Sequence, residues 1–249
     1  MNRVLTREIL DDLDTQDEQA LRARRDLRRV HRAMGTRSIV LRALRDMGDL
    51  RRRRATPLRV LELGAGDGSL MLGVARSLAP QWPAVELTLL DAQPLISQNN
   101  IDRFARLGWT AKPLVQDVFD WARDDNNSTP PVYSQANEPW DLVVANLFLH
   151  HFEKPQLAGL LRTVASRSDR FFACEPRRAW LSLVGSHLVG ALGTNAVTRS
   201  DAVSSVHAGF RGEELSALWP DIGDLWDVRE YPAGLFSHCF VAKPIEATP

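Results

Sequence analysis

Short apolar runs alternate with helical stretches along most of the chain, starting after a break at Thr56-Pro57. Five of the runs are rich in residues that favour strands. They occupy residues 58–63, 85–91, 110–116, 140–146 and 170–175. Helical periodicity marks residues 69–78, 95–107 and 154–166, which lie between them. This alternation is typical of a parallel sheet covered by helices on both faces.

The segment before this region is predicted to be helical. Residues 8–34 have the pattern of a polar helix with Gly35 as its end, and a second helix is predicted over residues 38–50. The first helix has one stripe that the spacing i, i+3, i+4, i+7 brings together. The residues of the stripe are Leu27, Val30, His31 and Met34.

The C-terminal region changes from helical to strand-like. Residues 176–219 are helical in character, and two strand-like runs follow at 225–231 and 235–241. Only Pro232-Ala233-Gly234 separates the two runs, so they are predicted to form an antiparallel hairpin, because a parallel crossover needs a longer connection.

Together these elements predict an α/β fold: a seven-stranded, mostly parallel Rossmann-like sheet with an antiparallel C-terminal hairpin and an N-terminal helical extension. The expected division is an extension over residues 1–56 and a main domain over residues 57–249. Within that domain, residues 176–219 form a helical insertion on the substrate side. Residues 124–138 are rich in turn formers and are predicted to be a surface loop.

The formal net charge of zero is a cancellation between two segments. Residues 1–54 hold 15 arginines and 9 acidic residues, a net +6, and the rest of the chain carries −6. The run Arg51–Arg54 is either a solvated linker or a contact for an anionic substrate, an acyl-carrier protein or RNA.

Cysteine usage and hydropathy bear on the compartment. Cys174 and Cys239 are too few for a disulfide framework or a cysteine zinc site, and we expect no metal. The N-terminus lacks the apolar core of a signal peptide, and no apolar run reaches the ~18 to 20 residues of a membrane span. We therefore expect a cytoplasmic protein.

A glycine-rich loop follows the first predicted strand, with the sequence Glu62-Leu63-Gly64-Ala65-Gly66-Asp67-Gly68. Glycines permit a tight turn and a close approach of the backbone to a ligand. The spacing G-x-G-x-G differs from the G-x-G-x-x-G of dinucleotide-binding loops. The carboxylate of Glu62 would repel a pyrophosphate, but it suits a ligand with an ammonium or sulfonium group.

On these residues the chain resembles the class I S-adenosylmethionine-dependent methyltransferases, whose first motif is E/D-x-G-x-G-x-G after the first strand. The resemblance covers residues 58–175 and implies S-adenosylmethionine as the cofactor. It assigns the ribose hydroxyls to Asp91, the adenine to Asp117 and its apolar neighbour, and the amino-acid end to the residues after the fourth strand. The implied cofactor-binding residues are Glu62, Gly64, Ala65, Gly66, Asp67, Gly68, Asp91, Ala92, Asp117, Val118, Asn146 and Leu147.

Four of these assignments have a structural alternative. Asp91 could cap the next helix, Asp117 could be a solvated turn residue, and Asn146 could be a plain residue at a strand end. Gly68 could serve only the packing of the helix on the strand.

Methyl transfer requires alignment of the reacting atoms, and a base is needed only where the acceptor loses a proton. His150 and His151 follow the fourth strand and are the candidate catalytic residues, with a structural role at the start of a helix as the alternative. His187 and His207 lie in the helical insertion and either line the substrate site or are ordinary helix residues.

Several acceptors are excluded. Asn146 is followed by Leu147-Phe148, which lacks the prolines and aromatic residue of enzymes that methylate base amines. Cys174 is misplaced for methylation of a cytosine carbon, and Asn146 stands where metal-assisted catechol enzymes need a carboxylate. We therefore do not expect nucleic acid as a partner.

The acceptor is expected to be a small molecule. Residues 175–188 are apolar enough for either core packing or an acceptor pocket roofed by the N-terminal helices. Residues 26–35 and 175–188 also resemble bacterial methyltransferases of polyketide and phenolic-lipid synthesis. The expected function is methyl transfer to an oxygen or carbon of a largely apolar, phenolic or polyketide acceptor. A carrier protein or a homodimer through the N-terminal helices is a further expected partner.

Two alternatives remain from the sequence. The first is a non-catalytic, regulatory paralogue that binds the cofactor. The second is a nicotinamide oxidoreductase, which the glycine spacing and Glu62 disfavour.

Overall fold

The computed structural model describes residues 1–47, 57–123, 139–221 and 225–245. The predicted surface loop at 124–138 and the run Arg51–Arg54 lie outside the described residues, as does the end of the predicted helix 38–50.

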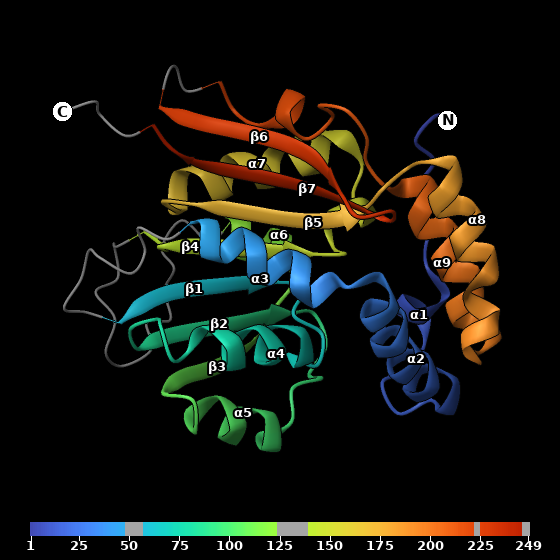
Figure 1. Cartoon of the computed structure of the whole chain (residues 1–249), viewed down its shortest axis with the longest axis horizontal. Helices are drawn as coiled ribbons and strands as arrows, with labels where there is room; N and C mark the ends of the chain where they lie inside the picture. The colour runs from blue at the N-terminus through green and yellow to red at the C-terminus, as the bar shows by residue number, and fades with distance from the viewer. Residues whose placement is uncertain (48–56, 124–138, 222–224, 246–249) are drawn as a thin grey trace.

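Seven strands form one sheet in the order β3-β2-β1-β4-β5-β7-β6 (Figure 1). Strands β1 to β5 pair in parallel, and β7 runs antiparallel to both β5 and β6. The predicted mostly parallel sheet with its C-terminal hairpin is therefore confirmed. The strands are β1 (Leu58–Leu63), β2 (Val85–Asp91), β3 (Trp109–Val115), β4 (Leu142–Asn146), β5 (Phe171–Pro176), β6 (Trp226–Ala233) and β7 (Ser237–Pro244).

Helices cover both faces of the sheet and bury one core on each. One face carries α3 (Thr36–Asp46), α4 (Ser69–Leu78) and α5 (Gln98–Ala105). The other carries α6 (Val118–Arg123), α7 (Lys154–Arg167) and the short helix η4 (Ser216–Leu218). Successive residues of a strand face opposite sides, so each buried strand supplies both cores.

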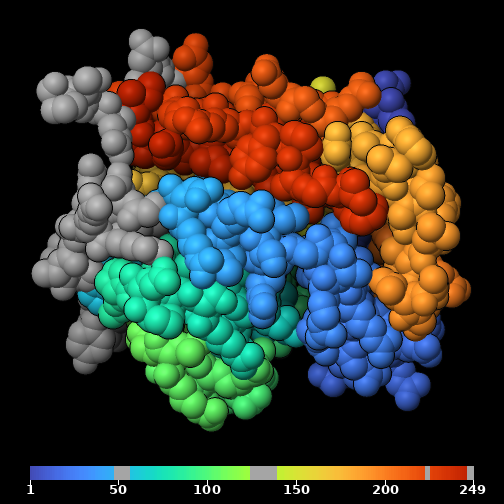
Figure 2. Space-filling model, viewed as in Figure 1, coloured from blue at the N-terminus to red at the C-terminus, as the bar shows by residue number. Residues whose placement is uncertain are grey.

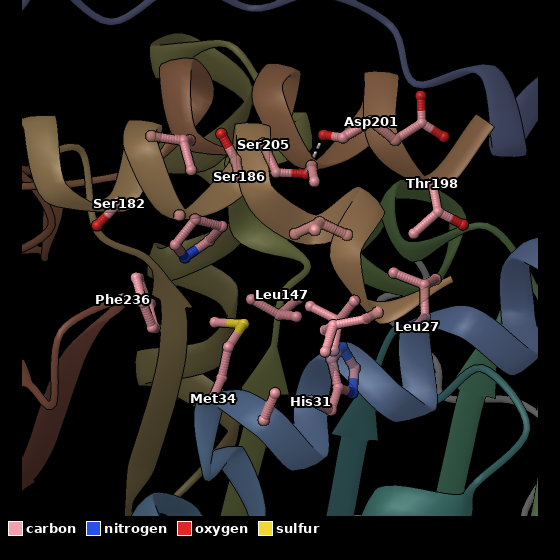
Figure 3. A pocket seen from close by; sticks show the side chains of 18 of the residues that line it. Leu27, His31, Met34, Leu147, Ser182, Ser186, Thr198, Asp201, Ser205 and Phe236 are labelled. Carbon is pink, nitrogen blue, oxygen red and sulfur yellow. Dashed lines mark hydrogen bonds between the residues drawn. The ribbon is translucent and has the colours of Figure 1, made fainter. Parts of the chain in front are cut away.

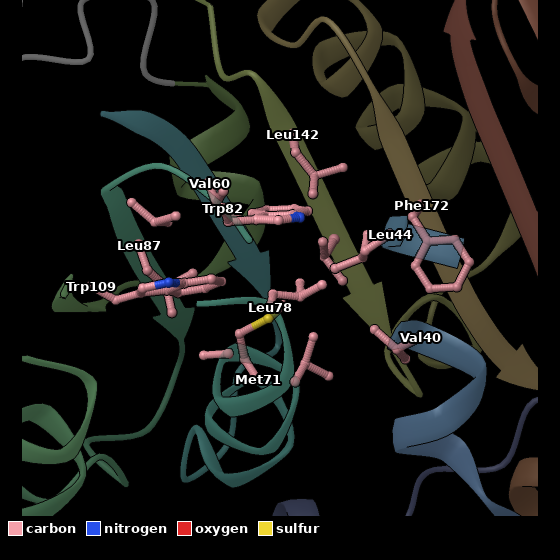
Figure 4. Close-up of a cluster of buried hydrophobic side chains, with 14 of the residues drawn as sticks. Val40, Leu44, Val60, Met71, Leu78, Trp82, Leu87, Trp109, Leu142 and Phe172 are labelled. Atoms are coloured by element: carbon pink, nitrogen blue, oxygen red, sulfur yellow. The ribbon is translucent and has the colours of Figure 1, made fainter. Parts of the chain in front are cut away.

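Helix α3 differs from the prediction that residues 1–56 form an extension. Its residues Val40 and Leu44 are buried in the same cluster as Phe172 of β5 (Figure 4). Because these apolar side chains pack directly against the sheet, α3 is part of the core. Of the described part of residues 1–56, the segment before Gly35 lies outside the helical layers of the sheet.

The remaining helices lie beyond the carboxyl ends of the parallel strands (Figure 1). They are α1 (Ile9–Asp12), α2 (Glu18–Met34), α8 (Trp180–Leu188) and α9 (Ala196–Ala208), with short turns η2 (Leu149–His151) and η3 (Val189–Leu192). Helix α2 packs against α9, and Figure 2 shows the blue α2 segment beside the orange α8–α9 segment.

The single helix predicted over residues 8–34 is two helices. The chain leaves the helical conformation after Asp12, and Asp17 starts α2 by accepting hydrogen bonds from the amides of Gln19 and Ala20. Such a cap competes with continuation of the helix through residue 17. Gly35 ends α2 in the left-handed conformation with φ 69°, as predicted.

No helix in the described part of the chain is long and apolar enough to cross a membrane.

Candidate functional site

The glycine loop between β1 and α4 lies at the carboxyl end of β1 and has three residues with positive φ. These angles are 66° at Gly64, 55° at Gly66 and 71° at Gly68. A Cβ at Gly64 would lie 2.2 Å from Cδ2 of Phe148, whereas a Cβ at Gly66 would have no atom of the described residues within 4 Å. Gly64 thus permits contact with the loop after β4, and the backbone at Gly66 borders open space.

Asp91 holds this loop from the end of β2. Its Oδ2 accepts a hydrogen bond from the Gly66 amide (2.8 Å), and its Oδ1 accepts one from the Gln93 amide (2.9 Å). Burial raises the pKa of Asp91, while these two hydrogen bonds oppose the shift. The helix that follows, α5, is capped by Ser97 and not by Asp91. The Asp91 carboxylate therefore lies against the glycine loop, at the Gly66 amide.

Two side chains at the strand ends have buried oxygen atoms without a partner. Oε2 of Glu62 in β1 and Oδ1 of Asn146 in β4 form no hydrogen bond with any described residue. Burial raises the pKa of Glu62 to about 8, and the charges of Asp67 and Asp91 add to the shift. A buried acceptor without a donor is unfavourable. The pair therefore fits a ligand that brings N–H donors or a positive charge, such as an ammonium group.

An apolar cavity of about 330 Å³ lies beyond the ends of β4 and β5 (Figure 3). Its walls come from α2, α8 and α9, and its floor includes Leu147 and Pro176. Leu147 has φ 50°, a left-handed conformation that is strained for leucine. The apolar side chains around the cavity include Leu27, Val30, Met34, Leu188, Val206 and Phe236.

Polar contacts hold helix α2 on two sides of the cavity, at the glycine loop and at α9. Arg28 forms an ion pair with Asp67 of the glycine loop (2.9 Å), and Arg24 donates to the side chain of Gln93 (3.0 Å). On the other side, the buried carboxylate of Asp26 accepts from the Asn195 amide at the start of α9 (2.8 Å). One helix thus forms a wall of the cavity and also contacts the glycine loop.

Helix α1 is held in a similar way. The carboxylate of Asp201 in α9 accepts hydrogen bonds from the amides of Ile9 and Leu10, at 2.9 and 3.0 Å. These bonds satisfy amides at the start of α1 that have no partner within the helix.

His150 is buried between two carboxylates. Its Nδ1 lies 2.8 Å from Oε2 of Glu175, and its Nε2 lies 3.3 Å from Oε1 of Glu8. Burial alone would lower the pKa of His150, but the hydrogen bonds and charges of Glu175 and Glu8 raise it to about 9. At neutral pH both ring nitrogens hold protons, so this geometry favours the structural alternative for His150 over that of a base.

The other histidines differ in accessibility. His151 is partly exposed, with Nδ1 3.3 Å from Oδ2 of Asp11. Neither His187 nor His207, both among the described residues, lines the cavity. A catalytic role for His151 remains a prediction.

Comparisons with known proteins bear on the fold. No protein-family model matches the chain, and no curated protein matches its sequence. Among solved structures, the chain is similar to a magnesium protoporphyrin IX methyltransferase (ChlM) from Synechocystis PCC 6803 with bound SAM, at 16% identity and TM-score 0.51 over 92% of this chain and 86% of that one. It is also similar to the riboflavin-analogue dimethyltransferase RosA from Streptomyces davawensis, at 16% identity and TM-score 0.55 over 96% of this chain and 62% of that one.

The pyocyanin biosynthetic protein PhzM is similar at 14% identity and TM-score 0.55, over 93% of this chain and 60% of that one. This chain has the class I methyltransferase fold. It spans less than two thirds of the length of RosA and PhzM. At these identities the likeness concerns the methyltransferase fold, and the activity has to be argued from the site.

Within this methyltransferase fold, Asp117 and Val118 have structural roles. Oδ1 of Asp117 accepts the Phe119 amide at the start of α6 (2.7 Å), and the residue is exposed. Val118 is buried in the core on the face of the sheet that α6 and α7 cover. Their contact with the adenine therefore remains a prediction, as do the contacts of Ala65, Gly68 and Ala92.

The sequence analysis missed four polar residues around the cavity of this methyltransferase fold. Glu8 and His31 line it, Asp201 lines it and caps α1, and Asp26 anchors α2. Asp26 and His31 did fall in the stretch 26–35 that carried the finer resemblance. The sequence signal for His31 is its place on the otherwise apolar stripe of α2, where a polar residue indicates a functional role.

Proposed function

We propose that the chain is an S-adenosylmethionine-dependent methyltransferase that acts on an oxygen or carbon of a small, largely apolar acceptor. The observation that carries the proposal is the shared wall: α2 borders the apolar cavity and also contacts the glycine loop through Arg28 and Asp67. Ligands of open α/β sheets bind at the carboxyl ends of the strands, which is where both compartments lie. Acceptor and cofactor would thus meet beneath one helix.

The proposed cofactor contacts follow from the chemistry of the site. Asp91 would accept the ribose hydroxyls, and the unpartnered oxygens of Glu62 and Asn146 would receive the ammonium group. When bound, S-adenosylmethionine supplies a methyl group on a positively charged sulfur. The chain's own contribution is to align the acceptor with that methyl group and to exclude water under α2.

The size of the cavity limits the acceptor. A volume of about 330 Å³ is at the small end of the ~300 to 1,000 Å³ of small-molecule pockets, which favours an acceptor of one or two rings. The similar structures include enzymes named for a porphyrin and a riboflavin analogue, which supports a ring-containing acceptor. We also propose that the protein is cytoplasmic. Its proposed partner is a carrier protein or a second copy of the chain.

Calorimetry with S-adenosylhomocysteine tests the cofactor. We expect binding with release of a proton at pH 7, because Glu62 has a pKa of about 8 and a bound ammonium favours its ionised form. The proton appears as a binding enthalpy that varies with the ionisation heat of the buffer. In Glu62→Gln this buffer dependence should disappear. Binding of NAD in place of S-adenosylhomocysteine would contradict the proposal and support an oxidoreductase.

A cavity-filling variant tests the acceptor site. Ala202 of α9 lines the cavity, so Ala202→Phe should reduce the affinity for a small apolar phenol such as para-pentylphenol by more than about ten-fold. Affinity for S-adenosylhomocysteine should stay the same. Ala105→Phe, which adds the same ring on the exposed side of α5, is the matched control. Equal phenol binding by both variants would show that the acceptor lies elsewhere.

A further inference from the structure

The polar side chains in the cavity wall are almost all engaged within the protein. For example, Ser182 donates to the carbonyl of Leu235, and the single hydroxyl proton of Ser205 lies between two acceptors, the Glu8 carboxylate and the carbonyl of Asp201. The engaged polar residues of the wall are Glu8, Ser182, Ser186, Thr198, Asp201 and Ser205. The hydroxyl protons of the four serine and threonine residues are thus committed within the protein, and both carboxylates already have partners.

His31 differs from them. Its Nε2 is buried and has no hydrogen-bond partner among the described residues. The residue lies in the last turn of α2 and lines the cavity, on the side opposite Ser186 and Ser205 (Figure 3). A buried ring nitrogen without a partner is unfavourable, and a ligand with a complementary group would satisfy it.

The protonation state of His31 suits the role of an acceptor of a hydrogen bond. Burial lowers the pKa of His31 to about 4, and the charge of Asp67 opposes the shift only in part. The imidazole is therefore neutral at pH 7 and has one nitrogen with a free lone pair. His150, by contrast, has both nitrogens held by carboxylates.

We propose that His31 binds the hydroxyl of the methyl acceptor through Nε2 and takes its proton, so that the acceptor is an apolar phenol or alcohol methylated on oxygen. This inference rests on the proposed function. As the acceptor oxygen attacks the methyl carbon, the O–C bond forms, and the C–S bond breaks with its electron pair left on sulfur. The proton of the hydroxyl passes to Nε2 of His31 and then to solvent.

A weak base is sufficient for this step. The hydroxyl becomes far more acidic as its oxygen bonds to the methyl carbon, so the proton leaves at the transition state rather than before it. The position of His31 suits this step, because α2 borders the cavity with His31 and contacts the glycine loop through Arg28.

Paired probes test the contact independently of turnover. Para-pentylphenol and para-pentyltoluene differ only in a hydroxyl in place of a methyl group, and their dissociation constants can be measured in the presence of S-adenosylhomocysteine. The ratio of the two constants should shift by about ten-fold toward the toluene in His31→Phe, equivalent to about 1.4 kcal/mol. His187→Phe, the same replacement at an exposed histidine of α8 that does not line the cavity, should leave the ratio unchanged.

Methylation of para-pentylphenol separates binding from proton transfer. His31→Gln can still form a hydrogen bond but cannot take a proton, so kcat should fall about 100-fold with a smaller change in KM. Unchanged affinity for S-adenosylhomocysteine shows that each variant is folded. If the wild-type protein does not bind S-adenosylhomocysteine, the proposed function itself is wrong. Retained cofactor binding with no phenol binding, or with an equal probe ratio in His31→Phe, would overturn this inference alone.

Discussion

Replacement of Glu175 by alanine is expected to lower the free energy of unfolding by about 3 to 5 kcal/mol, the cost of removing one partner from a buried ion pair. Glu175 is fully buried at the end of β5. Its carboxylate accepts hydrogen bonds from the amides of Phe148 (3.1 Å) and Leu149 (3.0 Å) and pairs with the ring of His150. Alanine would leave these amide donors without a partner, and the buried His150 ring would keep only Glu8.

Urea unfolding followed by circular dichroism measures this change. Glu213→Ala, at an exposed glutamate, should change the free energy of unfolding by less than about 0.5 kcal/mol. Similar values for the two variants would show that the Glu175 network contributes little to stability.

The same network gives a pH dependence of stability. The pKa of His150 is raised to about 9 from an ordinary 6.5, so the folded protein holds this proton more tightly than the unfolded chain. The contribution of His150 is complete below pH 6.5 and is lost as the pH rises through 9. The loss of stability over this range should therefore be smaller in Glu175→Ala than in the wild-type protein.

Replacement of Asp91 by alanine is expected to weaken the binding of S-adenosylhomocysteine by at least about 100-fold. Two hydrogen bonds from ribose hydroxyls to a carboxylate contribute ~1.5 to 3 kcal/mol each, and ~1.4 kcal/mol corresponds to ten-fold in affinity. The variant also loses the bond that holds the Gly66 amide. Asp91→Asn, which keeps one acceptor oxygen, should have an intermediate affinity.

Calorimetry measures both affinities, and thermal unfolding identifies variants that fail to fold. Asp102→Ala is the matched control, because this aspartate lies on the exposed side of α5 and its side chain accepts a hydrogen bond from Gln98 of the same helix. Wild-type affinity in a folded Asp91→Ala protein would exclude the ribose contact.

The strands and the glycine loop could be predicted because their signals are local. Residues 58–63 and 85–91 were predicted with the bounds of β1 and β2, since short apolar runs ended by polar residues have few other solutions. Helical periodicity alone does not separate α1 from α2, because the break between them depends on the capping hydrogen bonds of Asp17. Local patterns thus located the elements but not every boundary.

The cavity could not be predicted in the same way. Glu8 meets His150 across 142 positions of sequence, and Asp26 meets Asn195 across 169. Nothing in the neighbourhood of either residue specifies such a partner. Nothing along the apolar stripe of α2 indicates that Nε2 of His31 has no hydrogen-bond partner among the described residues of the fold.

Leu147 combines backbone strain with a place in the cavity floor. Its left-handed backbone conformation, with φ 50°, is one that glycine adopts without strain, yet its side chain forms part of that floor. Leu147→Gly would relieve the strain, but it would also remove a partly buried apolar side chain and give the unfolded chain more conformational freedom. A strained residue persists only where the surrounding structure holds it, so the floor of the cavity is held in shape before any acceptor enters.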